Sequence, residues 1–381
     1  MNKLLTTSLL IAGLSGASHA AGLDDAFKKG TTSGQLRLGY ISVSPDATGS
    51  ETTTGGAMGG EIKFETAKWN RFQLALAPYF VEKVDALTGD DTKINGDFFD
   101  GNNESYAYLG EAYVNYAFKN GSFRYGRQKL DTPFINTDDI RMFSNTFTAA
   151  WLNMAMSKSL TLDLGQVSTW AGFDSGSSQE KFKRASNDGV SAFGLNYKAS
   201  DDFSAQAWYY SFDKAFSLIY ADATYSTGNL EIGVQMGSYS ESDASGVDGS
   251  VLGASITYSA GPFTLAAVMN SGTNDDGKSA SLGLGGGNYY AAMDESTIDG
   301  LNDAEAQVIS IEYAATDKFT AAVAVGHFED NGAATEIDET NVVLSYSASD
   351  SLDVELIHTT VDALGTADDF SRQTLRATYS F

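Results

Sequence analysis

Three charged residues stand close together in a segment of unusual composition. Asp138, Asp139 and Arg141 lie between residues 126 and 147, a stretch that does not alternate as a strand does. The same stretch carries large apolar side chains, namely Phe134, Ile135, Ile140, Met142, Phe143 and Phe147. Opposed charges can attract and orient ions, most strongly in a narrow space where the effective dielectric constant is below that of bulk water. Because a loop on an outer surface is rarely so apolar, we expect this segment to fold inward and pack on the rest of the protein.

More charged residues precede this segment and recur along the chain. Arg124 alternates with aromatic neighbours, so it should lie on a polar face. Strict alternation would place Arg127 and Lys129 on the apolar face, unless Gly126 marks a bulge that resets the register. Alternation also places a set of charged residues on the polar faces of other strands, namely Glu61, Lys63, Glu111, Asp163, Asp353, Glu355, Arg372 and Arg376.

No pattern for catalysis or for a transition metal is evident. The histidines His19, His327 and His358 have no metal-ligand spacing, and no Ser-His-Asp set can be assembled with them. We therefore expect no metal and no cofactor. Two acidic stretches leave Ca²⁺ binding by a loop open, although neither has the spacing of a defined calcium loop. They comprise Asp90, Asp91, Asp97, Asp100 and Glu104, and then Asp275, Asp276, Asp294, Glu295, Asp299 and Asp303.

The charged residues are carried by alternating segments of about ten residues, the length of a strand that crosses a membrane. Short connections rich in Asn, Gly, Asp and Ser take turns with mostly longer ones, which include 44–58, 85–107, 131–148, 169–189 and 271–304. This order places all the short turns at one end of an antiparallel meander. The last strand shows the alternation clearly, with Arg372 and Arg376 on one face and Leu375, Ala377, Tyr379 and Phe381 on the other.

The two ends of the chain indicate export to a membrane. Residues 1–20 have a positive start, a short apolar stretch and a small-residue cleavage pattern, which predict a signal peptide followed by one β-barrel domain over residues 21–381. No later segment is apolar for long enough to form a transmembrane helix, so an exported chain could span a membrane only as a closed barrel. Tyr379 and the terminal Phe381 resemble the aromatic assembly signal of bacterial outer-membrane barrels, which implies the barrel-assembly machinery as a partner.

The composition agrees with such a barrel. The chain has no Cys, 4 Pro and 39 Gly, which suits many strands with tight turns, and its net charge of -25 argues against nucleic acid as a partner. We predict an all-β fold, a transmembrane antiparallel barrel of about 18 strands with short periplasmic turns, long external loops and an inward third loop. A β-sandwich is the alternative, because one-sided alternation also suits a two-sheet core. It does not predict the aromatic residues that follow nearly every short turn.

The segment from residue 126 to residue 147 resembles the OprD-type porin family, including the related major porins of epsilonproteobacteria. The resemblance rests on Gly126, Gln128, Leu130, Thr132, Pro133, Asp139, Arg141 and Phe147. It implies an 18-stranded barrel, often trimeric, whose third external loop narrows the pore. It also implies a ladder of lumenal basic residues that guides carboxylated solutes, and it carries a role in the constriction to Asp139 and Arg141.

Together these features predict an outer-membrane porin through which ions and small hydrophilic solutes diffuse passively. The predicted constriction comprises Asp138, Asp139, Arg141, Arg124, Arg127 and Lys129. The acidic loops favour cations, whereas the basic ladder implied by the resemblance favours carboxylates. An adhesive or structural surface barrel with acidic ligand-binding loops is the alternative. A barrel phospholipase comes third, because His327 and His358 have no evident Ser partner.

Overall fold

A computed structural model describes residues 20–90, 92–176, 178–275, 277–364 and 369–381. The predicted signal peptide therefore lies almost wholly outside the described residues. A short helix, α2 (Ala20–Lys28), precedes the first strand. The strands are β1 (Thr31–Pro45), β2 (Thr53–Glu65), β3 (Phe72–Lys83), β4 (Tyr106–Phe118), β5 (Gly121–Gln128), β6 (Thr146–Ala155), β7 (Leu160–Ala171), β8 (Lys183–Arg184), β9 (Val190–Lys198), β10 (Phe203–Phe212), β11 (Phe216–Thr227), β12 (Leu230–Glu241), β13 (Gly249–Ala260), β14 (Phe263–Thr273), β15 (Glu305–Thr316), β16 (Phe319–Asp330), β17 (Thr335–Ser349), β18 (Leu352–Leu364) and β19 (Phe370–Ser380).

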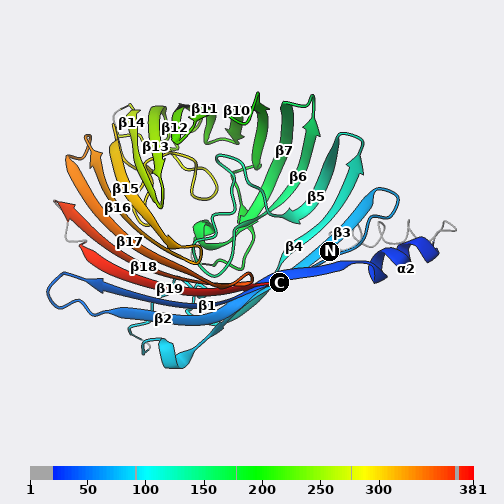
Figure 1. Ribbon diagram of the computed structural model, residues 1–381, viewed down its shortest axis with the longest axis horizontal. Helices are drawn as coiled ribbons and strands as arrows, with labels where there is room; N and C mark the ends of the chain where they lie inside the picture. Colours follow the sequence, from blue (N-terminus) through cyan, green and yellow to red (C-terminus); the bar gives the residue numbers. More distant parts are fainter. Residues whose placement is uncertain (1–19, 91, 177, 276, 365–368) are drawn as a thin grey trace.

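The sheet closes on itself. Each long strand pairs with its neighbour in sequence in antiparallel register, and β1 pairs with both β2 and β19, for example through Leu38 and Ala377. The two-residue strand β8 adds only a short pairing to β7, while β7 pairs with β9 along its length. The described residues thus form an 18-stranded barrel with one extra short strand, visible as a ring in Figure 1. This confirms the predicted fold.

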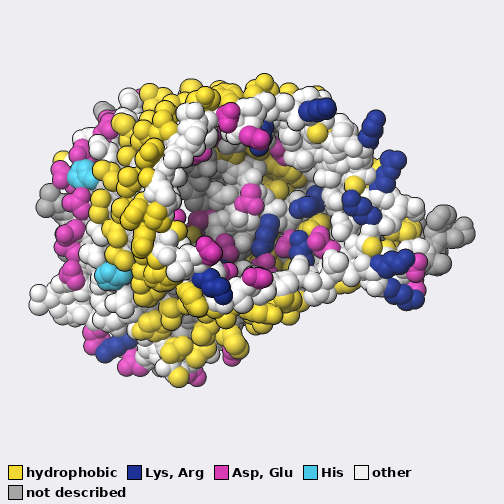
Figure 2. Space-filling view, viewed as in Figure 1, with side chains coloured by type: hydrophobic (Ala, Val, Ile, Leu, Met, Phe, Trp, Pro, Cys, Tyr) yellow, Lys and Arg dark blue, Asp and Glu magenta, His cyan; other side chains and the backbone are white. Residues whose placement is uncertain are grey.

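The two faces of the wall differ as the alternation predicts. In β12, Ile232, Val234 and Met236 are exposed, whereas the side chain of Gln235 between them is buried on the inner side. The outer surface is covered with apolar side chains, and charged ones surround the hollow (Figure 2). A β-sandwich would bury such apolar side chains between two sheets. Their outward position excludes that alternative and suits contact with lipid.

The short connections lie where the sequence places them. Gly228 and Gly261 take φ values of 58° and 61° in two of these hairpins, a backbone conformation that glycine adopts without the penalty other residues meet. The first predicted long connection, 44–58, was too long, because β1 continues to Pro45 and β2 begins at Thr53. The start of β2 is rich in glycine because loop residues pack closely on it, and a Cβ at Gly56 would lie 2.2 Å from the Cβ of Leu87.

The buried core lies inside the barrel, between the wall and the long connections. Loop 3 (residues 129–145) and loop 7 (residues 274–304) both contribute to it. One cluster joins Phe134 and Leu284 from these loops to the wall, and a second joins Met142 to Phe98 of the connection between β3 and β4. No helix in the described part of the chain has the length and apolar character needed to cross a membrane.

Candidate functional site

Loop 3 is packed on the inner wall through an aromatic side chain. The ring of Phe134 lies 5.1 Å from that of Tyr220, 5.3 Å from that of Tyr289 and 5.9 Å from that of Tyr210, all in edge-to-face geometry. The Tyr210 hydroxyl donates a 3.0 Å hydrogen bond to the hydroxyl of Thr132, also in loop 3. Edge-to-face aromatic pairs stabilise beyond the area they bury. The apolar residues of this segment therefore attach it to the wall.

Loops 3 and 7 are joined by backbone hydrogen bonds. The Leu284 amide donates to the Phe134 carbonyl and the Asn136 amide donates to the Leu284 carbonyl, each at 3.0 Å. The Asn136 side chain adds two bonds, accepting from the Gly286 amide and donating to the Gly287 carbonyl, each at 3.1 Å. These bonds satisfy buried backbone groups that would otherwise carry a desolvation cost. The two loops therefore form one body inside the barrel.

A buried arginine that sequence reasoning did not select holds loop 3 to the closing strands. Two guanidinium nitrogens of Arg37, on β1, donate to the two carboxylate oxygens of Asp139 at 2.9 and 3.0 Å. Arg37 also donates to the Arg141 carbonyl at 2.6 Å and to the Thr378 hydroxyl at 3.0 Å. Arg376 donates to the Asp139 carbonyl at 3.2 Å. Burial alone would raise the pKa of Asp139, but the hydrogen bonds and charge of Arg37 hold it below its usual value.

Arg141 is buried where several connections meet. Its guanidinium lies 3.3 Å from the Asp97 carboxylate and 3.6 Å from that of Glu295, and it stacks 4.4 Å from the ring centre of Phe173. The side chain is 4% exposed. This predicted constriction residue therefore acts first as a cross-link among the long connections. Its charge is shared with two carboxylates and does not face open water.

Arg372 on β19 carries a second cross-link to loop 7. Its guanidinium forms ion pairs with Asp294 and Glu295, and the hydroxyl of Thr359 donates to Asp294 at 2.8 Å. Burial acts to raise the pKa of Asp294, but the positive charge of Arg372 holds it below its usual value. Asp294 and Glu295 were considered from sequence only as calcium ligands. Loop 7 is anchored to the wall by the same two carboxylates.

The remaining lumenal bases also have acidic or aromatic partners. Lys63 lies 3.2 Å from Glu111, Lys129 lies 2.6 Å from Glu61, and Arg376 donates to Glu355 at 3.1 Å. The predicted acidic residues without a cationic partner accept from neutral groups. Asp163 accepts from Trp151, Asn153 and Asn196, and Asp353 accepts from Ser347. Arg124 stacks 4.5 Å from the ring centre of Tyr113.

The contacts of Arg127 place it away from the predicted constriction. β5 pairs with β4 and β6 without a register shift, so the bulge at Gly126 that would have turned Arg127 inward does not form. Arg127 therefore lies on the face opposite Arg124, where its guanidinium covers the Phe182 ring and donates to the Leu109 carbonyl. Lys129 does not follow the strand alternation, because β5 ends at Gln128, and its side chain contacts lumenal Glu61.

A cavity of about 490 Å³ lies between loops 3 and 7 and the end of β7. Its lining includes Asp138, Asp174 and Asp299, and the indole of Trp170 forms part of the wall. Asp138 and Asp174 share a hydrogen bond, and burial followed by the charge of Asp174 raises the pKa of Asp138 to about 7. Burial raises the pKa of Asp299 as well, although the Leu282 amide donates to its carboxylate at 3.0 Å. From the sequence, Asp138 was selected as a constriction residue and Asp299 only as a calcium ligand, while Asp174 was not selected.

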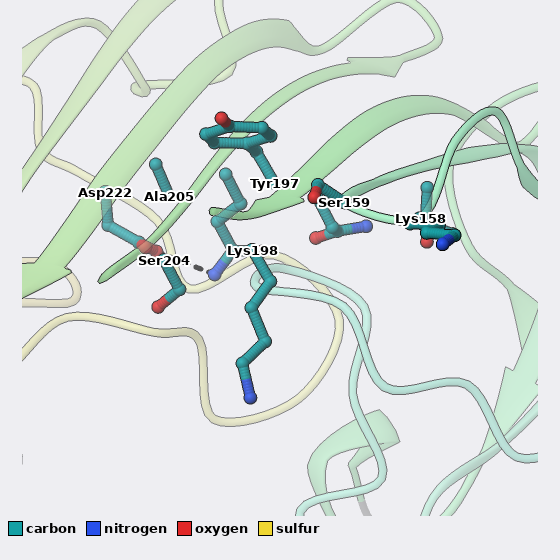
Figure 3. Close-up of a pocket in the computed structure, with 10 residues that line it drawn as sticks. Lys158, Ser159, Tyr197, Lys198, Ser204, Ala205 and Asp222 are labelled. Atoms are coloured by element: carbon teal, nitrogen blue, oxygen red, sulfur yellow. Dashed lines mark hydrogen bonds between the residues drawn. The ribbon is translucent and has the colours of Figure 1, made fainter. Parts of the chain in front are cut away.

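A second hollow of about 310 Å³ lies toward the short turns (Figure 3). It is lined by Lys158, Lys198, Gln206 and Asp222 among others, and the Gln206 amide donates to the Asp222 carboxylate at 2.7 Å. Sequence reasoning missed these residues. Alternation of polar and apolar residues could have identified them, because it places the polar side chains of β9, β10 and β11 on the inner face.

The described residues contain no group of three or more His, Asp or Glu side chains arranged to hold a metal ion. His327 lies 2.7 Å from Asp338 and 2.9 Å from Glu329, so its ring nitrogens are both engaged by carboxylates. A hydrolase of the serine type needs a histidine in contact with its nucleophile. The contacts of His327 supply none.

An all-antiparallel barrel with an apolar exterior and a charged interior defines an outer-membrane, multi-pass β-barrel. The chain belongs to the OprD family of outer membrane porins, whose family model matches residues 90–316. No curated protein sequence matches the chain. Solved structures that share its fold include the following three. Acinetobacter baumannii OccAB4 has a TM-score of 0.79 at 13% identity and covers 93% of this chain and 98% of its own. Pseudomonas aeruginosa OpdK, solved with vanillate, has a TM-score of 0.77 at 16% identity, and the match covers 93% of this chain and 99% of OpdK. Pseudomonas aeruginosa OccK9 (OpdG) has a TM-score of 0.79 at 15% identity, and the match covers 93% of this chain and 99% of OccK9.

Proposed function

We propose that this porin conducts ions and small hydrophilic solutes by passive diffusion through a lumen that loop 3 narrows. The observation that carries the proposal is the double hydrogen bond between Arg37 and Asp139, which fixes loop 3 against the inner wall. A constriction must keep its shape while solutes pass, and a bidentate guanidinium-carboxylate pair gives orientation as well as energy. Arg141, Arg372 and Arg376 brace the same region through their own ion pairs.

Family membership and the arrangement of charges support diffusion without covalent chemistry. Opposed charges in a narrow lumen set ion preference and orient zwitterions. The related OpdK was solved with vanillate, a small aromatic carboxylate, which supports the passage of small organic solutes through barrels of this shape. We include enzymatic inactivity in the proposal, because the chemistry described at the site is binding and positioning.

Single-channel recording in planar bilayers tests the proposal. The full chain should give stable conductance steps, and Asp139→Asn should raise their noise because it weakens the hold of Arg37 on loop 3. Asp243→Asn, in an exposed loop and outside the predicted lumenal set, makes the same change of charge and serves as the control. Folded protein that inserts but gives no conductance would overturn the porin function and favour an adhesive surface barrel.

Export, assembly and oligomeric state belong to the same proposal. Residues 1–20 would be removed as a signal peptide. Tyr379 and Phe381, whose rings stack at 6.2 Å on the exposed surface of the last strand, would be recognised by the barrel-assembly machinery. We further propose a homotrimer. N-terminal sequencing, assembly of a Phe381→Ala variant and native mass spectrometry in detergent test these three points separately.

A further inference from the structure

We infer that the lumen selects small monovalent cations, both inorganic ions and compact ammonium compounds, over anions. The inference rests on the proposed porin function and assigns its solute class. It rests on how the charges of the inner wall are paired. Six lumenal bases contact carboxylates and Arg124 stacks on Tyr113, whereas three acids at a cavity form no ion pair within the described part of the chain. A basic ladder that guides carboxylates would require the opposite balance.

Most basic residues of the lumen form ion pairs. Six lumenal bases each contact at least one carboxylate, namely Arg37, Lys63, Lys129, Arg141, Arg372 and Arg376. Three of them contact two carboxylates each. Lys63 meets Glu65 and Glu111, Arg141 meets Asp97 and Glu295, and Arg372 meets Asp294 and Glu295. An ion pair acts at a distance as a dipole, whose field falls faster than that of a free charge. These bases therefore attract anions weakly.

The bases leave some acids uncompensated. The Asp138 and Asp174 carboxyls bond to each other, and Asp174 also accepts from the Asn145 amide at 2.6 Å. The charge of Arg141 acts on both carboxyls, but its guanidinium forms ion pairs with Asp97 and Glu295. Within the described part of the chain, the Asp299 carboxylate accepts a hydrogen bond from the Leu282 amide and forms no ion pair. The hydrogen bond between Asp138 and Asp174 requires one shared proton, so this pair carries one negative charge while the proton is bound and two after it is lost at higher pH. The neutral donors to Asp174 and Asp299 orient these groups without removing their charge.

The uncompensated acids surround one cavity. Asp138, Asp174 and Asp299 line the same 490 Å³ cavity between loops 3 and 7. That volume admits a partly hydrated alkali ion or a compact ammonium compound, and the Trp170 indole in its wall suits an organic cation. The described acids are not grouped to hold a metal ion, which argues against a tightly chelated divalent ion. Weak attraction at several points permits entry and exit, as conduction requires.

Reversal potentials of the full chain under a KCl gradient at pH 8 test the inference. The wild type should be more permeable to K⁺ than to Cl⁻. In the triple variant Asp138→Asn, Asp174→Asn, Asp299→Asn, the K⁺ to Cl⁻ permeability ratio should be about fivefold lower than in the wild type, as expected for charges acting across a partly screened cavity. Asp243→Asn, in an exposed loop, is the control and should change little. A wild-type ratio at or below one, or a ratio that the triple variant leaves unchanged, would overturn the inference.

Two further measurements separate the possible failures. Replacing KCl by tetramethylammonium chloride should still give a cation current, and its absence would remove ammonium compounds from the solute class. Glu355→Gln should free Arg376 from its partner and shift the wild-type ratio toward Cl⁻. Conductance with anion preference would contradict this inference alone. An absence of any conductance would contradict the porin function itself.

Discussion

Arg37 on β1 binds Asp139 in loop 3 by donating two parallel hydrogen bonds of 2.9 and 3.0 Å to its carboxylate. The two residues are 102 positions apart in the chain, and Arg37 lies next to the seam where β1 meets β19. The contact therefore couples the closure of the barrel to the position of the loop that narrows it. Several measurable consequences arise from this coupling and from the neighbouring ion pairs.

Removing the guanidinium should release loop 3. Arg37→Ala leaves Asp139 without its partner, and we expect a local destabilisation of roughly 2 kcal/mol, less than for a fully buried pair because the Asp139 side chain is 34% exposed. Noisier channels and faster protease cleavage within residues 129–145 would show it. Arg71→Ala, at an exposed short turn, is the control. Equal cleavage rates for Arg37→Ala and wild type would show that the Arg37–Asp139 pair does not hold loop 3.

The cation preference should depend on pH. Burial and the nearby charge of Asp174 raise the pKa of Asp138 to about 7, so its carboxyl holds a proton at pH 6 and loses it by pH 8. The lumen becomes more negative across this interval, and the K⁺ to Cl⁻ permeability ratio should rise with pH. Asp139 and Arg141 also face this carboxyl, and the low pKa of Asp139 keeps it ionised throughout. A pH profile that is the same in wild type and Asp138→Asn would contradict the assignment.

Loss of Arg372 should destabilise the whole barrel interior. Arg372→Gln leaves the Asp294 carboxylate enclosed without its cation and leaves Glu295 with Arg141 alone, which we expect to cost about 3–5 kcal/mol because Arg372 is 3% exposed. The temperature at which the folded band disappears on a denaturing gel should fall. Arg184→Gln removes an exposed arginine and should leave that temperature near the wild-type value. Equal shifts in both variants would exclude a specific role for Arg372.

Packing of one aromatic ring should control the width of the pore. Phe134→Ala removes the ring that meets three tyrosines, at an expected cost of about 3–5 kcal/mol for a fully buried phenylalanine. Loop 3 should loosen and the single-channel conductance should increase. Phe134→Leu keeps much of the apolar volume and should lie closer to wild type. A narrower or unchanged channel in Phe134→Ala would contradict attachment of the loop through this ring.

The wall of the barrel could be predicted because its rules are local. Alternation in β12 and β19 fixes which side chains face lipid, and turn residues such as Gly228 end one strand and begin the next. The same rule would have found Arg37, which alternates with exposed Leu36 and Leu38. For Arg127 strict alternation also predicted the outer face, and its place in the predicted constriction depended on a bulge at Gly126 that the strand pairing lacks.

The barrel and its strand number could be predicted from the sequence, because strand period and turn chemistry act between near neighbours, and the motif between residues 126 and 147 indicated the family. The pairing of the charges, in contrast, depends on the folded barrel. Arg37 meets Asp139, and Arg372 meets Asp294, only because closure of the sheet and the inward course of loops 3 and 7 bring distant segments together. Electrostatic energy depends on distances in space and on burial, and neither can be read from positions along a chain.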